Sequence, residues 1–233
     1  MSSEFPSPRP DVGRALAWSF AAFRRNPVPY ISLAAVVAVI QMVQQLTFAP
    51  IQAVLTDCTD PQSPGQQAAC EAALGSSLTW GLTTTLVFVV LAFLATIGVL
   101  RAALGASRGI PAEFSLLWRT ENLGRYILFT LLYVLLVFIG VILCIIPGII
   151  AAILLQFGQL YALDRGTRPV EAAKASARVI RRHVGPAIVM FLVVLLLGLI
   201  GSAFYGILTL IALPFSSLFI VHMFRQYNGE AVA

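Results

Sequence analysis

Charged residues are scarce in this 233-residue chain, because Asp, Glu, Lys and Arg together make up only 11% of it. Soluble domains contain about 25% charged residues. Hydrophobic residues instead make up 59% of the chain, and its mean hydropathy is +0.89. This composition excludes an ordinary water-soluble domain. The short alternating strands of a membrane β-barrel are also absent, so the sequence predicts an all-α membrane protein.

Residues suited to catalysis or metal binding are few as well. The chain has two histidines, His183 and His222, and neither has Glu, Asp or Cys at the spacing of a metal site. Nucleotide-binding loops and hydrolase motifs such as HExxH and GxSxG are missing. No Asp, Glu, Lys or Arg lies deep in an apolar run, which argues against a proton-coupled pump. We therefore predict a protein that is not an enzyme and that has no metal and no cofactor.

What the chain does have is long apolar runs. Four segments lack Asp, Glu, Lys and Arg altogether: 27–56, 72–100, 126–163 and 184–224. A helix needs roughly 20 residues to cross about 30 Å of hydrocarbon. The last two segments are therefore long enough for two helices each, with turns at Pro147-Gly148 and near Gly201 to Gly206. The sequence thus predicts six spans, at about 28–50, 78–100, 126–146, 148–163, 184–202 and 205–224.

The positive charges support this number of spans. Under six spans with the N-terminus inside, all fifteen Lys and Arg residues fall on the cytoplasmic side, as the positive-inside rule requires. A single span over 126–163 would place six of these cations outside. Fourteen of the fifteen are Arg, which is typical of GC-rich genomes and favours a bacterial cytoplasmic membrane. We expect a cytoplasmic N-terminus at 1–26, a membrane domain at 27–225, an outer loop at about 57–76 and a cytoplasmic tail at 226–233.

Three of the predicted cytoplasmic segments open alike, with a proline followed by an acid: Pro10-Asp11, Pro111-Ala112-Glu113 and Pro169-Val170-Glu171. Proline and an acid both suit the first turn of a helix, and an amphipathic stretch follows each of them. The second and third segments also share Arg108-Gly109 and Arg165-Gly166. We therefore predict three helical hairpins, each preceded by an amphipathic helix in the membrane interface. Whether the three units are true internal repeats stays open.

Candidate binding residues fall into two polar groups. The third amphipathic stretch carries Lys174, Arg178, Arg181 and Arg182. These cations either enforce topology and reach anionic lipid, or they hold a phospholipid headgroup, a phosphate or a partner protein. The predicted spans carry glutamines that either bond helices to one another or line a polar cleft for a headgroup: Gln41, Gln44, Gln45, Gln156 and Gln159.

The three cysteines are expected to have different roles. Cys58 and Cys70 both lie in the predicted outer loop. An oxidising exterior favours a disulfide between two cysteines at this separation, so we predict that they are paired. Cys144 is expected to pack as an apolar residue within the third span.

Three short motifs carry a resemblance to known proteins. They are Ala15-Leu16-Ala17-Trp18-Ser19-Phe20 before Arg25-Asn26-Pro27, then Ile146-Pro147-Gly148-Ile149, then Glu171-Ala172-Ala173-Lys174-Ala175-Ser176 before Val179-Ile180-Arg181. Most of the chain thereby resembles the membrane domain fused to some bacterial glycerophosphoryl diester phosphodiesterases, and free-standing relatives of that domain. The resemblance implies a helical bundle in the bacterial cytoplasmic membrane with a tie to lipid or envelope metabolism. It does not imply phosphodiester hydrolysis, because that activity belongs to a separate soluble domain with His and acidic metal ligands.

Two functional hypotheses follow. The first is a non-enzymatic membrane subunit or assembly factor that binds anionic lipid headgroups or a partner, either another membrane protein or a second copy of the chain. The alternative is a transporter of a lipid or other amphiphile, which would use the glutamine-bearing helix faces and lack a proton-coupling site of its own. No nucleic acid partner is expected.

Overall fold

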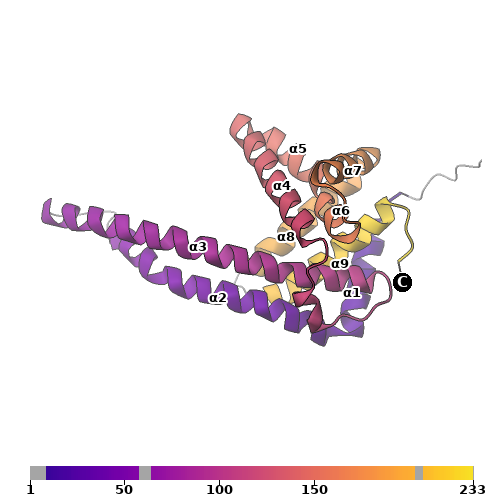
Figure 1. The fold of residues 1–233 in the computed structure, drawn as a ribbon, viewed down its shortest axis with the longest axis horizontal. Coiled ribbons are helices and arrows are strands. Elements are labelled where there is room, and N and C mark those ends of the chain that lie inside the picture. The colour runs from indigo at the N-terminus through magenta and orange to yellow at the C-terminus, as the bar shows by residue number, and fades with distance from the viewer. Residues whose placement is uncertain (1–8, 58–63, 203–206, 233) are drawn as a thin grey trace, which may run out of the picture.

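The fold is built from helices packed at different angles (Figure 1). A computed structural model describes residues 9–57, 64–202 and 207–232, and these three ranges contain helices and no β-strand. The helices are α1 Val12–Arg25, α2 Pro27–Asp57, α3 Pro64–Ala106, η1 Phe114–Trp118 (a 3₁₀ turn), α4 Leu123–Leu143, α5 Ile145–Leu155, α6 Gly158–Asp164, α7 Pro169–Arg182, α8 Val184–Ser202 and α9 Thr209–Tyr227. The predicted all-α class is thereby confirmed.

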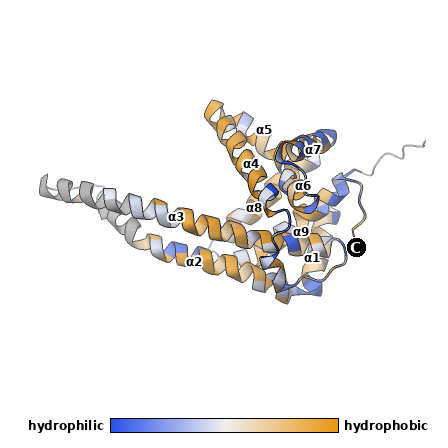
Figure 2. Cartoon of the chain, viewed as in Figure 1, coloured by the Kyte–Doolittle hydropathy of each residue, from blue (hydrophilic) through white to orange (hydrophobic). Residues whose placement is uncertain are grey.

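Six segments of the described chain are long and apolar enough to cross a membrane: Pro27–Ala49, Thr79–Ala106, Leu123–Leu143, Ile145–Asp164, Val184–Ser202 and Thr209–Tyr227. Large apolar side chains are exposed along α2, α3, α4, α5 and α8, and Figure 2 shows α4 as almost wholly hydrophobic. Apolar surface of this extent is not tolerated in water. Together these features indicate a multi-pass membrane protein.

The longest pair of helices corrects the expected outer loop. Figure 1 shows α2 and α3 side by side and extending away from the other helices. Helix α3 begins at Pro64, so most of the predicted loop at 57–76 is helical. The residues after Pro64 are rich in Ala, Gln and Glu, which favour helix, and proline suits the first helical position.

The break between α4 and α5 lies three residues before the predicted turn. Cys144 has an extended backbone between the two helices, and its side chain is exposed, so the expectation that it packs within a span is wrong. Pro147 instead stands in the first turn of α5, where its missing N–H has no partner to lose. Gly148 allows close approach of the helices, since a Cβ there would lie 2.9 Å from the backbone N of Val141.

The helix of the fourth membrane segment is interrupted between α5 and α6, and a side chain of α7 hydrogen-bonds to the backbone at the interruption. The hydroxyl of Ser176 in α7 donates to the carbonyl of Leu154 at 2.7 Å and accepts from the backbone N–H of Phe157 at 3.2 Å. Both groups would otherwise be left without a helical partner at a buried position. Helix α7 is therefore bound to the middle of the fourth segment.

Helix α9 is the most buried of the apolar helices, and it contacts α1, α2, α3 and α8. Aromatic rings pack where it ends: Phe224 lies 5.7 Å from Phe157 and 4.9 Å from Tyr161 between ring centroids. The second of the stretches predicted to be cytoplasmic and amphipathic forms only the short η1 turn, unlike α1 and α7. The position of these three elements in a membrane interface stays a prediction.

Candidate functional site

Helix α7 has one face against the protein and one face in solvent. Its start follows from Pro169 at the first position and Glu171 in the first turn, both favourable at a helix N-terminus. Ala172, Ser176 and Ile180 are buried, and their spacing of four residues places them on one side of the helix. That side packs against α4, α5 and α6.

The opposite side of α7 carries the four predicted cations: Lys174, Arg178, Arg181 and Arg182. All four side chains are exposed, and together with Ala177 they line one shallow hollow. Within the described ranges, none of the four forms an ion pair with a carboxylate. Figure 2 shows α7 as predominantly hydrophilic. The structure thus brings the predicted basic residues together on one surface and leaves their charge uncompensated.

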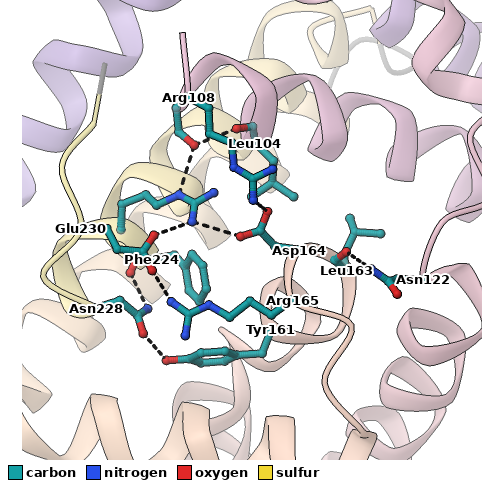
Figure 3. Close-up of polar contacts among 12 residues, drawn as sticks. Leu104, Arg108, Asn122, Tyr161, Leu163, Asp164, Arg165, Phe224, Asn228 and Glu230 are labelled. Carbon is teal, nitrogen blue, oxygen red and sulfur yellow. Dashed lines mark hydrogen bonds and ion pairs between the residues drawn. The ribbon is translucent and has the colours of Figure 1, made fainter. Parts of the chain in front are cut away.

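A second polar cluster was not predicted as a site from the sequence. The carboxylate of Asp164, at the end of α6, is 4% exposed and pairs with both Arg108 and Arg225, as Figure 3 shows for the labelled side chains. Arg225 lies 3.0 Å from Asp164 and also donates to the hydroxyl of Ser107 at 3.2 Å. This cluster therefore joins the C-terminal ends of α3, α6 and α9.

The segment after α9 extends the same cluster. Glu230 pairs with Arg165 and with Arg225, and the hydroxyl of Tyr161 donates to Asn228 at 2.7 Å (Figure 3). Each of the three helix ends is followed by a glycine at positive φ: Gly109, Gly166 and Gly229, at 75°, 59° and 68°. This conformation closes a helix C-terminus at little cost only for glycine. Two of these glycines, Gly109 and Gly166, are the glycines of the Arg-Gly pairs noted in the sequence, so each of those pairs marks the end of a helix.

Other polar contacts bring the starts of the helices to the same place. The backbone N–H of Asp11 before α1 donates to Gln226 at 2.6 Å, and Asn122 before α4 donates to the carbonyl of Leu163 at 3.2 Å. The hydroxyl of Tyr227 donates to the carbonyl of His183 before α8 at 2.5 Å. Helix starts and helix ends that the sequence assigns to one side therefore lie together.

Three of the five candidate glutamines bond neighbouring helices. Gln41 accepts from the hydroxyl of Thr209 at 3.0 Å. Gln156 donates to the carbonyl of Ala187 at 3.3 Å, and Gln159 donates to the hydroxyl of Thr130 at 3.4 Å. These contacts match the reading of the glutamines as bonds between helices. The other two differ in burial, since Gln44 is half-buried and Gln45 is exposed.

Gln156 and Gln159 also line a half-enclosed cavity of about 160 Å³. Its remaining walls come from apolar side chains and one tyrosine, on α4, α5, α8 and α9: Tyr133, Leu155, Met190, Phe191, Val194 and Ile220. An apolar cavity of about 150 Å³ is large enough for a molecule the size of benzene. This cavity can therefore admit part of an amphiphile, though not a whole lipid.

The predicted disulfide lies partly beyond the described ranges. Cys70 is disulfide-bonded, whereas Cys58 falls in 58–63, outside the residues that the structure describes. The pairing of Cys58 with Cys70 stays a prediction.

Sequence reasoning missed Asp164, Arg225 and Glu230 as site residues. A signal was present for one of them, because Asp164 is an acid directly before Arg165 in a segment otherwise rich in cations. One partner of Asp164 is Arg225, which lies 61 residues further along the chain. Pairs so distant in sequence form only when the helix ends are brought together.

Comparison with known proteins finds relatives without an assigned role. The chain is 29% identical over 227 residues to uncharacterised proteins of Mycobacterium bovis and of Mycobacterium tuberculosis strain CDC 1551, and 28% identical to one of strain H37Rv. Each match covers 95% of this chain and 70% of the relative. No family model and no solved structure matches the chain. The resemblance to the phosphodiesterase-linked membrane domain therefore stays a prediction.

Proposed function

We propose that this chain is a non-enzymatic protein of the bacterial cytoplasmic membrane that binds anionic phospholipid headgroups through the exposed face of α7. The observation that carries the proposal is the group of four exposed cations without carboxylate partners in the described chain. Four like charges on one helix repel one another in water. An anionic lipid surface removes that repulsion and attracts each Lys or Arg by about 1 kcal/mol.

The place of α7 in the fold also supports a lipid ligand. Helix α7 ends at Arg182, and the apolar segment Val184–Ser202 follows after one residue. The basic face therefore lies beside the start of a membrane segment, at the depth where headgroups are found. The proposal further places α7, both termini and the charge cluster of Asp164 on the cytoplasmic side, where Lys and Arg concentrate.

The test compares two variants with the same loss of charge. The first replaces Lys174, Arg178, Arg181 and Arg182 with Gln, and the control replaces Arg9, Arg14, Arg24 and Arg25 with Gln. Bound phosphatidylglycerol and phosphatidylcholine are counted by native mass spectrometry of protein purified in maltoside detergent. The α7 variant should bind phosphatidylglycerol at least about tenfold more weakly, because about 1.4 kcal/mol corresponds to a factor of ten.

The control variant should retain most of its preference for phosphatidylglycerol. Equal losses in both variants would contradict a specific site on α7 and indicate only general attraction to anionic lipid. Unchanged lipid binding with loss of a co-purifying membrane protein would instead favour the partner-binding function.

The cavity beside Gln156 and Gln159 favours transport of an amphiphile as a second candidate function. Amide groups in an apolar cavity can bind a hydroxyl or ester group without the desolvation cost of a buried charge. Movement of fluorescent lipid across liposomes containing the protein would support this function, provided that Gln156→Leu lowers the rate.

A further inference from the structure

Arg101 is a buried cation near the end of α3. The residue is 9% exposed, and its guanidinium donates through Nη2 to the backbone carbonyl of Glu121. Its Nε atom is buried and has no hydrogen-bond partner, and among the described residues no carboxylate forms an ion pair with it. The carboxylate of Glu121 and the guanidinium of Arg119 act on Arg101 only at longer range.

This arrangement is physically unfavourable for the protein alone. A buried cation loses its hydration, and the loss is offset only when an anion and further hydrogen bonds replace the water. Arg225 shows how the fold balances such a charge elsewhere, because its side chain is 7% exposed and pairs with both Asp164 and Glu230, although its Nη2 atom also lacks a hydrogen-bond partner. Arg101 is similarly buried, yet it has a backbone carbonyl where Arg225 has two carboxylates.

Arg101 lines a cleft of about 200 Å³ between the end of α3, the 107–122 segment and the end of α6. Arg108 and Arg119 line it too, and so do three acids. Asp164 is already bound by Arg108, and Glu113 accepts a hydrogen bond from Ser115 at 3.0 Å. Glu113 and Glu121 are both exposed. The buried guanidinium that lacks an ion pair with a carboxylate in the described chain is therefore that of Arg101, with the exposed Arg119 lining the same cleft.

We propose that this cleft binds a phosphate-type monoanion, in which the phosphoryl oxygens accept hydrogen bonds from Arg101 and Arg119. Guanidinium groups bind phosphate through paired N–H donors, and the Nε donor of Arg101 has no hydrogen-bond partner within the protein. Glu113 and Glu121 lower the positive potential of the cleft, which favours a singly charged phosphodiester over a doubly charged phosphate. The volume of about 200 Å³ is roughly seven times the 30 Å³ that a water molecule takes in the liquid, enough for a phosphodiester with a small polar group.

Two sources of such an anion share this chemistry: the headgroup of a phospholipid in the adjacent leaflet, and a soluble phosphodiester. The site is separate from the basic face of α7, because its arginines come from α3 and from the segment after η1. The inference therefore goes beyond the proposed function and stands or falls on different residues.

The experiment uses full-length protein in maltoside detergent and phosphate-free chloride buffer. The probes are glycerophosphoglycerol, phosphatidylglycerol in mixed micelles and inorganic phosphate. Binding is measured by calorimetry and by the shift in unfolding temperature. The test variant is Arg101→Met, which removes the charge and keeps a long side chain; the control is Arg25→Met, which removes an exposed arginine on α1.

The wild type and the Arg25→Met control should bind the phosphodiester probes, and Arg101→Met should lower affinity at least tenfold. Without any phosphate or phosphodiester probe, Arg101→Met should unfold at the same temperature as the wild type or higher, since it removes a buried charge that has no ion pair. The Gln variant of the four α7 cations lacks the proposed headgroup site of α7, so the phosphodiester binding that it keeps belongs to this cleft. In that variant, equal affinity for the soluble and the lipid probe identifies a soluble ligand, and binding of the lipid alone identifies a membrane lipid.

Two results would overturn the inference. One is equal phosphodiester affinity in the wild type and Arg101→Met. The other is a large loss of stability in anion-free Arg101→Met together with normal anion binding by Arg119→Gln, because Arg101 would then serve only to hold the carbonyl of Glu121. Arg119 is exposed, so its variant tests the site even if Arg101→Met fails to fold.

Discussion

Gly158 shows how one residue without a side chain positions the interrupted fourth segment. A Cβ at this position would lie 1.9 Å from Cζ of Phe129, and the Phe129 ring is fully buried, so it has no room to move aside. Gly158→Ala should therefore destabilise the protein by about 2 kcal/mol, as overpacking of a core does. Thermal unfolding in detergent measures this change.

Gly198→Ala provides the matched control, because a Cβ at that position in α8 would meet no atom within 4 Å. This variant should be neutral or slightly stabilising, since it reduces the freedom of the unfolded chain. Equal effects of the two substitutions would show that the close contact between α6 and Phe129 is not a determinant of stability.

Among the candidate site residues, those with a local pattern could be predicted and those with distant partners could not. Lys174, Arg178 and Arg181 recur at helical spacing opposite small and apolar residues, so their common face follows from the sequence. The environment of Arg101 depends on α6 and the 107–122 segment lying around the end of α3. The residues next to Arg101 in the sequence therefore give no indication that its side chain is buried.

The helices themselves were predicted better than the points where they end. Apolar length predicts six membrane segments, because a span must satisfy its backbone within itself. The Pro147-Gly148 pair was wrongly interpreted as the turn, since proline in the first turn of a helix and glycine at a close helix contact produce the same sequence signal. The interruption between α5 and α6 depends on Ser176, which lies about twenty residues further on.

Asp164 joins three helix ends, so its charge is expected to stabilise the arrangement of α3, α6 and α9. Asp164→Asn leaves Arg225, which is 7% exposed, with Glu230 as its remaining carboxylate partner. Loss of one partner from a buried ion pair costs about 3 kcal/mol. We expect a loss of stability of about this size, measured by denaturation in detergent and without loss of helix content before unfolding.

The control for this variant is Glu171→Gln, which removes an exposed acid with no ion pair in the described part of the chain. It should change stability by less than about 1 kcal/mol, the size of a helix-dipole contribution. Adding Arg225→Met to Asp164→Asn should recover part of the loss, since the unpaired cation is removed. A double variant less stable than Asp164→Asn would contradict this account of the cluster.

At the scale of the whole molecule, the polar contacts and the distribution of charge agree. The ion pairs of Asp164 join the ends of α3, α6 and α9, and other polar contacts bring the starts of α1, α4 and α8 to the same place. The turn at Cys144 lies at the other end of α4, whose 21 residues would span about 30 Å. If the polar end is cytoplasmic, Cys144 must face the exterior.

This orientation predicts the accessibility of single cysteines. With Cys58 and Cys70 replaced by Ala, Cys144 is exposed at its turn and should react with a membrane-impermeant maleimide added to intact cells. A second variant combines Cys144→Ser with Ser115→Cys, which moves the single cysteine to η1. Ser115 is exposed on the side rich in cations, so the cysteine placed there should be labelled only after the membrane is permeabilised. Mass spectrometry of the labelled protein measures both reactions. The reverse pattern would place the basic face of α7 outside, where the leaflet lacks the anionic lipid potential that attracts it, and would contradict the proposed headgroup site.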